Sequence, residues 1–242
     1  MTLKPKYNRI LLKISGELLK GGHDFGFDGK NISSFGDQIH SIVRMGVQVA
    51  LVVGGGNIFR GGSPFAADMD RTTADNIGML ATLINALMLQ DTFEKKGMEV
   101  RILSAIPAPN VAEPFIRRRA IRHLESGRIV VFACGTGSPF FTTDTAAALR
   151  ANEVDADVLI KGTKVRGVFS ADPEKDPSAQ FFKSITYSEV LTRNLKVMDA
   201  ASFAMCRDNN LPIIIFDLTQ PENLKGVVLG ESVGTLVRGE EN

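Results

Sequence analysis

Short apolar runs, rich in β-branched residues, alternate along this chain with segments of helical period. Glycine, proline or charged residues bound each run, which is typical of strands buried on both faces of a parallel sheet. The pattern predicts strands at residues 9–14, 47–53, 99–103, 128–133, 156–160 and 212–216.

The segments between these runs have the period of helices. We expect helices at residues 32–45, 70–96, 113–126, 144–152, 200–209 and 221–228. The clearest is the segment 70–96, in which five apolar residues fall on one face: Ile77, Leu80, Ile84, Leu87 and Met88. Strand alternating with helix predicts an α/β fold, a doubly wound sheet with helices on both faces.

The interval 162–186 breaks this rhythm. It has few apolar runs and contains Asp172-Pro173 and Asp176-Pro177, which favour turns, so we expect a loop there. The chain has no internal repeat, low-complexity tract or linker composition. We therefore expect one domain over residues 1–242, with a functionally distinct C-terminal half.

Composition and charge narrow the classes of function. The chain has 242 residues, 44% of them hydrophobic, which is enough for a large core without disulfides. It has 28 Lys and Arg against 27 Asp and Glu, so no bulk charge draws it to nucleic acid or to a membrane. An anionic ligand must therefore be held by local geometry.

The cysteines and the N-terminal segment predict the compartment. Cys134 and Cys206 lie far apart without the spacing of metal ligands, which favours reduced thiols in a reducing cytosol. The N-terminal segment has charges within a short apolar run, unlike a signal peptide, and no apolar stretch approaches the roughly 20 residues of a membrane span. We expect a soluble, cytoplasmic protein.

Glycine-rich loops follow several of the predicted strands, at the edge where ligands of open α/β sheets gather. After the second strand, Gly54-Gly55-Gly56 can point backbone N–H groups at one anion without obstruction from side chains, or can form only a tight turn. A similar loop with Gly135 and Gly137 follows the fourth strand, and Arg60 could clamp a phosphate. Together these features favour a phosphate site.

Lys13 closes an otherwise apolar strand, where a charge is costly without a partner or access to solvent. It could stabilise charge on a transferring phosphoryl group, or it could extend from the strand end into water. Ser15-Gly16 directly after it allows close approach of the backbone to a further phosphate.

The loop after the fourth strand ends in Thr142-Thr143-Asp144, just before a predicted helix. These residues could cap that helix, and a carboxylate here could also orient Lys13 or organise a metal–nucleotide complex. Of the adjacent Phe140 and Phe141, we expect one ring in the core and the other free to stack on a base.

Several familiar motifs are missing. The chain has no P-loop and no protein-kinase signature, and Phe140 replaces the third glycine of a dinucleotide fingerprint. The histidines, His23, His40 and His123, are scattered, so neither a histidine metal site nor a hydrolase triad is indicated.

These residues resemble the amino acid kinase family, and within it the bacterial UMP kinases. The resemblance covers essentially the whole chain, from Lys13–Glu17 through Gly54–Gly61 and Ser104–Pro107 to Lys196–Asp199. Its most specific element is the stretch Gly135–Asp144, which is similar to the segment that holds the acceptor nucleotide. The resemblance implies a three-layer αβα sandwich with a mainly parallel central sheet. It also implies transfer of phosphate from ATP to UMP in pyrimidine nucleotide biosynthesis.

The resemblance also implies a role for each matching residue. Lys13, Asp144 and Arg60 would be catalytic. ATP would contact Lys13, Ser15, Gly16, Gly56, Arg60, Thr163, Phe169 and Asp172. UMP would contact Gly55, Asp75, Thr136, Gly137, Ser138, Pro139, Phe140, Phe141, Thr142 and Thr143. The N-terminal half would thus hold mainly UMP and the C-terminal half mainly ATP. Mg²⁺ would be bound through the ATP phosphates, with no metal ligand from the protein.

The resemblance further implies a homohexamer, with activation by GTP and inhibition by UTP as one form of regulation. Gln90 and Glu94 depart from the basic and aromatic residues of effector positions, whereas Arg101 and Arg128 are retained, and the departures count against activation by GTP. The cluster Arg117-Arg118-Arg119 with Arg122 could bind an effector phosphate or form a solvated or inter-subunit face. Ser138 stands where relatives often have Asn.

Two other functions are compatible with the motifs. An enzyme of the same fold could phosphorylate a carboxylate or carbamate, which would require a small-acid pocket in place of the segment 139–143. A nucleotide-binding regulatory protein would need no transfer residues, and the presence of both Lys13 and Asp144 disfavours it.

Overall fold

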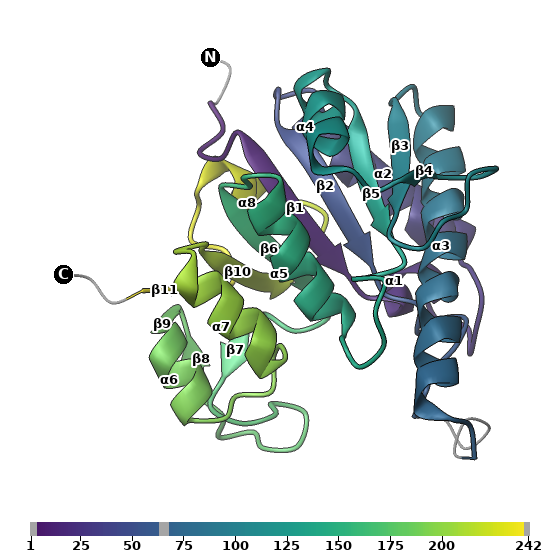
Figure 1. The fold of residues 1–242 in the computed structure, drawn as a ribbon. Helices are drawn as coiled ribbons and strands as arrows, with labels where there is room; N and C mark the ends of the chain where they lie inside the picture. Colours follow the sequence, from purple (N-terminus) through teal and green to yellow (C-terminus); the bar gives the residue numbers. More distant parts are fainter. Residues whose placement is uncertain (1–3, 63–67, 240–242) are drawn as a thin grey trace.

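A nine-stranded sheet forms the centre of the computed structural model, which describes residues 4–62 and 68–239 (Figure 1). The strand order is β4-β3-β5-β2-β1-β6-β10-β11-β9, and every neighbouring pair is parallel except β10 and β11. The strands are β1 (Arg9–Ile14), β2 (Gln48–Val53), β3 (Val100–Ser104), β4 (Glu113–Pro114), β5 (Ile129–Ala133), β6 (Val158–Thr163), β9 (Ser184–Thr186), β10 (Ile213–Asp217) and β11 (Thr235–Arg238). The expected mainly parallel sheet is confirmed.

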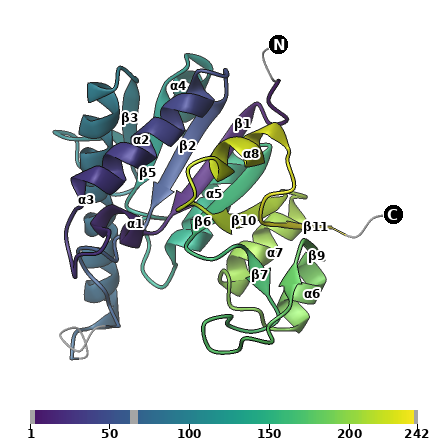
Figure 2. The same ribbon diagram turned by 180° about the vertical axis from the view of Figure 1, so that it is seen from behind.

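Helices cover both faces of the sheet. One face packs against α1 (Gly16–Lys20), α2 (Gly29–Val43), α3 (Arg71–Lys95) and α8 (Asn223–Leu229). The other packs against α4 (Arg117–Glu125), α5 (Thr143–Glu153), α6 (Tyr187–Thr192) and α7 (Ala200–Asp208). Figure 1 shows α4, α5 and α7 in front of the sheet, and Figure 2 shows α2 and α8 from behind. The three-layer αβα sandwich is confirmed.

Two of the predicted elements are wrong in part. The helix expected over residues 113–126 begins at Arg117, because Glu113 and Pro114 form β4 at the sheet edge, where a proline is tolerated. The loop expected over residues 162–186 contains the end of β6, the strand β9 and a small antiparallel pair, β7 (Val168–Phe169) with β8 (Phe181–Phe182). Strands of two residues are too short for a periodic signal.

Helix α3 is confirmed, but its predicted apolar face is only partly in the core, because Leu87 and Met88 pack there while Leu80 and Ile84 face outward. Leu80 and Ile84 are 46% and 48% exposed. The opposite side of the helix, including Met79, Ala86 and Phe93, packs in the core. The middle of the helix is therefore apolar on its outward side as well as on its core side, which is unusual for a helix with one face in water.

Two smaller expectations concern the cysteines and the membrane. Both cysteines, Cys134 and Cys206, are buried and free. Across the described ranges, no helix combines the length and the hydropathy that crossing a membrane requires.

Candidate active site

Lys13 and Lys161 lie side by side at the carboxyl ends of the two central strands. They are direct partners in the parallel register of β1 and β6. Side chains of a strand alternate between its faces, so Lys13 shares a face with Leu11, and Lys161 shares one with Leu159. Both leucines pack in the core beneath α5 and α7. The register therefore delivers two ammonium groups to the same face, beside the start of α5.

Asp144, in the first turn of α5, binds both lysines. Lys13 Nζ lies 2.8 Å from Oδ1, and Lys161 Nζ lies 2.7 Å from Oδ2. Burial would raise the pKa of Asp144, but the charges of Lys13 and Lys161 outweigh it and hold the pKa below its usual value. Burial lowers the pKa of Lys161, with Asp144 opposing that effect. The carboxylate thus remains ionised between two cations.

Capping of α5 falls to Thr142, which leaves Asp144 free for the lysines. Thr142 Oγ1 accepts the N–H groups of Asp144 and Thr145 at 3.0 and 3.3 Å, and its hydroxyl donates to Asp199 Oδ2. Asp199 in turn caps α7, accepting the N–H of Ser202 at 2.8 Å. One hydrogen-bonded chain therefore fixes the first turns of both helices around the Lys13–Asp144–Lys161 triad.

A pocket of about 370 Å³, which we call the lysine pocket, adjoins this triad. It is lined by Lys13, Ser15, Glu17, Leu18, Arg60, Lys161, Gly162, Thr163, Lys164 and Leu218. The structure thus brings together four residues expected around ATP, namely Lys13, Ser15, Arg60 and Thr163. The side chain of Arg60 donates to the Gly56 carbonyl at 3.2 Å and pairs with Glu17. Burial would raise the pKa of Glu17, but Arg60 and Lys20 lower it overall.

The loop glycines differ in what the surrounding atoms require of them. A Cβ on Gly16 would lie 2.3 Å from Asn57 Oδ1, and one on Gly55 would lie 2.8 Å from the Gly78 carbonyl. These two positions need glycine for packing alone. A Cβ on Gly56 would meet nothing nearer than 3.8 Å, so packing within the described residues does not explain this glycine.

A second hollow of about 160 Å³, the glycine pocket, lies between the loop after β2, helix α3 and the loop before α5. It is lined by Gly55, Gly56, Phe59, Gly61, Ala74, Asp75, Gly78, Met79, Thr82, Gly135, Thr136, Phe141, Thr142 and Thr143. Six of the residues expected around UMP meet here: Gly55, Asp75, Thr136, Phe141, Thr142 and Thr143. Gly137, Ser138, Pro139 and Phe140 belong to the same loop but do not line this pocket.

The expectation that Phe140 or Phe141 packs in the core is wrong. Their exposed fractions are 67% and 54%. The loop turns sharply through left-handed residues, with φ of 57° at Gly135, 81° at Gly137 and 71° at Phe140, and this carries both rings outward. Two exposed aromatic rings beside a pocket are available to a ligand.

Phe169 and Asp172, also expected near ATP, lie apart from the lysine pocket. They line a hollow of about 460 Å³ with Arg193, Lys196 and neighbouring residues. The ring of Phe169 packs against Phe181 with 5.3 Å between centroids, so the β7–β8 pair holds it in place.

Lys161 and Asp199 are site residues to which the sequence reading gave no role. Lys161 ends an apolar strand just as Lys13 does, and this shared signal could have identified it. Asp199 stands directly before a helix, where its capping role was recognisable. Their meeting with Asp144 depends on strand neighbours that no local pattern specifies.

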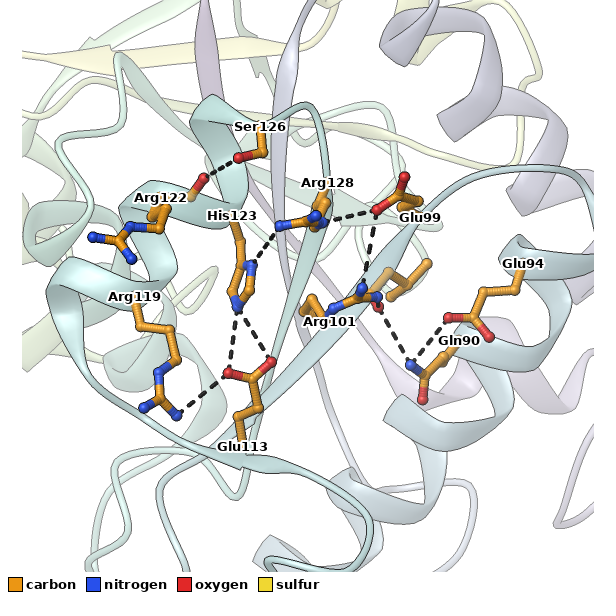
Figure 3. Close-up of polar contacts among 11 residues, drawn as sticks. Gln90, Glu94, Glu99, Arg101, Glu113, Arg119, Arg122, His123, Ser126 and Arg128 are labelled. Carbon is orange, nitrogen blue, oxygen red and sulfur yellow. Dashed lines mark hydrogen bonds and ion pairs between the residues drawn. The ribbon is translucent and has the colours of Figure 1, made fainter.

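Figure 3 shows the polar contacts of most residues considered for effector binding, among them Gln90, Arg101 and Arg128. Glu99 pairs with Arg128 at 2.8 Å and with Arg101 at 4.0 Å, while Gln90 donates to Glu94 at 3.2 Å. Of the basic cluster on α4, Arg119 pairs with Glu113 at 3.3 Å and Arg117 with Asp155 at 2.5 Å. Four of these arginines therefore already have acidic partners within the chain.

The arrangement of a mainly parallel αβα core with glycine-rich loops at its carboxyl edge agrees with a family-level match. The sequence model of the amino acid kinase family matches residues 8–217. The chain belongs to the amino acid kinase family.

Solved structures similar to this amino acid kinase include two UMP kinases and one uridylate kinase. The UMP kinase from Bacillus anthracis is 41% identical, with 97% of each chain covered and a TM-score of 0.94. The UMP kinase from Ureaplasma parvum is 37% identical over 96% of this chain and 99% of that one, with a TM-score of 0.90. The uridylate kinase from Archaeoglobus fulgidus is 29% identical over 94% and 99%, with a TM-score of 0.74.

Proposed function

We propose that this chain catalyses ATP-dependent phosphorylation of UMP to UDP. The observation that carries the proposal is the Lys13–Asp144–Lys161 triad, which places two lysine side chains, 10% and 13% exposed, beside the lysine pocket and close to the glycine pocket. Similarity to UMP kinases over nearly the whole chain supports UMP as the acceptor.

The transfer is direct and in line. A phosphate oxygen of UMP forms a bond to the γ-phosphorus of ATP while the bond from that phosphorus to the β,γ-bridging oxygen breaks, and ADP and UDP result. Such a reaction needs positioning and charge stabilisation rather than a protein nucleophile. The ammonium groups of Lys13 and Lys161 supply positive charge where negative charge develops, and Asp144 fixes their positions.

The carboxylate of Asp144 is compatible with magnesium that enters bound to ATP. Within the described residues no group of three or more His, Cys, Asp or Glu side chains is arranged to hold a metal. Asp144 Oδ1 is buried and accepts no hydrogen bond of regular geometry, although the Lys13 ammonium lies 2.8 Å away. This oxygen could accept a hydrogen bond from a metal-bound water. When bound, magnesium neutralises charge on the phosphates.

The two pockets suggest where each substrate binds. We treat the molecule as a single domain. UMP would occupy the glycine pocket, with Asp75 on its ribose and the loop from Gly135 to Thr143 around it. The ATP phosphates would occupy the lysine pocket, beside Ser15, Gly16, Gly56 and Arg60, and adenosine would extend toward Thr163, Phe169 and Asp172. Arg60 would exchange Glu17 for phosphate oxygens when substrate binds.

The proposal also includes assembly into a homo-oligomer. The family resemblance implies six copies. The outward face of α3 supports assembly, because Leu80 and Ile84, one helical turn apart, form an exposed apolar stripe there. A second copy of the chain would remove this stripe from water. We place the reaction in the cytoplasm, where the free thiols of Cys134 and Cys206 would stay reduced.

Regulation by GTP is the implication of the resemblance that the residues of this chain support least. An effector phosphate would have to displace Glu99 from Arg101 and Arg128, and Gln90 and Glu94 add no positive charge. We therefore propose a response to GTP below about twofold in turnover, since these ion pairs compete with the effector. Rates measured with and without GTP, and with UTP as inhibitor, test this point.

A transfer assay on the purified protein tests the main proposal. ATP is supplied with UMP, CMP, dUMP or small carboxylates, and ADP formation is followed. We expect the highest kcat/KM with UMP. No ADP above background with UMP would overturn the proposal, and faster turnover of CMP or a carboxylate would assign a different acceptor.

A further inference from the structure

Arg71, in the first turn of α3, makes an ion pair that differs from the other surface pairs of this helix. Its Nε lies 2.9 Å from Oδ2 of Asp75, four residues on. A pair with this spacing on a helix surface contributes little to stability. Lys95 and Asp91, at the other end of α3, make the same kind of pair at 2.6 Å.

The Asp75 carboxylate also reaches across to the acceptor loop. The same Oδ2 atom accepts the backbone N–H of Phe140 at 2.8 Å, whereas Asp91 has no such second partner within the described residues. Asp75 therefore links helix α3 to the loop that precedes α5. Among the described residues its Oδ1 accepts no hydrogen bond, and this oxygen remains available to a ligand in the glycine pocket.

Phe140 holds a conformation that requires support. Its φ of 71° lies in the left-handed region, which bulky residues rarely adopt. Its ring is 67% exposed, so core packing does not hold it. The contacts that do are the N–H bond to Asp75 and the guanidinium of Arg71, whose Cζ lies 5.6 Å from the ring centroid.

We infer that Arg71 is a positioning residue that sets the preference of the acceptor site for a ribonucleotide over a 2′-deoxyribonucleotide. It occupies Oδ2 of Asp75 together with the Phe140 N–H, which orients the carboxylate and leaves Oδ1 for a ribose hydroxyl. It also holds the Phe140 ring, and with it the loop, against α3. This inference rests on the proposed function, because it assumes that a nucleoside monophosphate binds in the glycine pocket.

The kinetic test compares Arg71→Ala with a matched control, Lys95→Ala, which removes the other i,i+4 cation of the same helix. For Arg71→Ala we expect KM for UMP to rise about tenfold, because the Asp75 carboxylate loses the cation that orients it, with kcat and KM for ATP nearly unchanged. The ratio of kcat/KM for UMP to that for dUMP should fall by a similar factor. Lys95→Ala should change none of these values.

An unchanged UMP-to-dUMP ratio in Arg71→Ala, or an equal change in Lys95→Ala, would overturn the inference. Amide hydrogen exchange in the segment 135–143 gives a readout that needs no turnover. Arg71→Ala should speed exchange of the Phe140 N–H, whereas Lys95→Ala should not, and equal exchange in both would refute the coupling. If the wild-type protein fails to phosphorylate UMP, the proposed function falls, while the exchange experiment still decides whether Arg71 holds the loop.

Discussion

At the residue scale, the candidate site is a problem of charge balance. Two lysines and one aspartate meet in a largely buried triad. Both lysines pair with the aspartate, and with both protonated the triad carries a net positive charge. A buried charge is costly until something opposite neutralises it. Under the proposed function, a phosphoryl group that gains negative charge during transfer would meet that need, and the triad would then favour the transition state.

Asp144→Asn tests whether this carboxylate acts on the reaction or only on binding. We expect kcat to fall about 100-fold or more, because the two ammonium groups lose the group that fixes them. KM for UMP should change less than about threefold, since Asp144 does not line the glycine pocket. Steady-state kinetics measure both values, with Asp91→Asn on the surface of α3 as control. Equal losses in kcat and in UMP binding would make Asp144 a binding residue.

The lowered pKa of Asp144 also predicts how stability depends on pH. Because the folded state holds the pKa of Asp144 below its ordinary value of 3.8, the ionised carboxylate stabilises the fold fully above that value. That contribution is lost as pH falls through the lower, folded pKa. Urea unfolding between pH 6 and strongly acidic pH should therefore show a smaller loss of stability for Asp144→Asn than for the wild type. At pH 6 the variant should be less stable by about 3 kcal/mol, because two buried lysines lose their partner. Parallel pH profiles for the two proteins would contradict this assignment.

The sequence identified individual residues better than their partners. Lys13 and Asp144 were recognisable from a charge ending an apolar strand and an acid opening a helix. Lys161 carries the same local signal as Lys13, but its position beside Lys13 follows from the pairing of β1 with β6, which is a property of the whole sheet. The outward position of Phe140 depends on a left-handed backbone that residue type alone does not indicate.

At the scale of elements, short pieces of structure position the loops of the site. Helix α1 has only five residues and begins directly at Ser15-Gly16, so the loop after β1 is held by its contact with the loop after β2. The long elements were predictable because the apolar period persists over them. Seven short elements were not predicted, because they carry little periodic signal and depend on contacts made elsewhere: α1, α6, β4, β7, β8, β9 and β11.

Gly16→Ala tests that contact between the loops. A Cβ there would lie 2.3 Å from Asn57 Oδ1 and 2.8 Å from the Gly54 carbonyl, and backbone cannot move aside easily. Crowding of this kind costs about 1–3 kcal/mol, more than the roughly 1 kcal/mol that alanine gains over glycine within a helix. We expect lower stability to urea and a raised KM for ATP. Gly22→Ala, where a Cβ would meet nothing within 4 Å, is the control and should change neither. A variant as stable as wild type would show that the loops are not in close contact.

At the scale of the whole molecule, the sandwich leaves one long helix incompletely covered. Helix α3 stands at one edge of the fold (Figure 1), and Leu80 and Ile84 form an exposed apolar strip on it. In sequence this strip has the period expected of a core face, and only the structure reveals that the opposite side of the helix meets the sheet. A helix that is apolar all round is typical of one buried on both sides.

Ile84→Asp should therefore weaken self-association. A charge placed in the centre of an apolar interface is costly, so we expect a smaller species in analytical ultracentrifugation at equal protein concentration. Phe25→Asp, at an apolar residue outside α3 that is 79% exposed, is the control and should leave the mass unchanged. An oligomer of unchanged mass in Ile84→Asp would place the subunit contact elsewhere.

The register that joins Lys13 to Lys161 has a consequence for folding kinetics. The two lysines come from distant parts of the chain, and a slip of one residue between β1 and β6 would turn one of them to the opposite face of the sheet. Contacts between distant segments form slowly, because the intervening chain must be ordered first. After dilution from denaturant, activity should therefore return later than the circular-dichroism signal of the helices. The rate of its return would report when β1 and β6 pair.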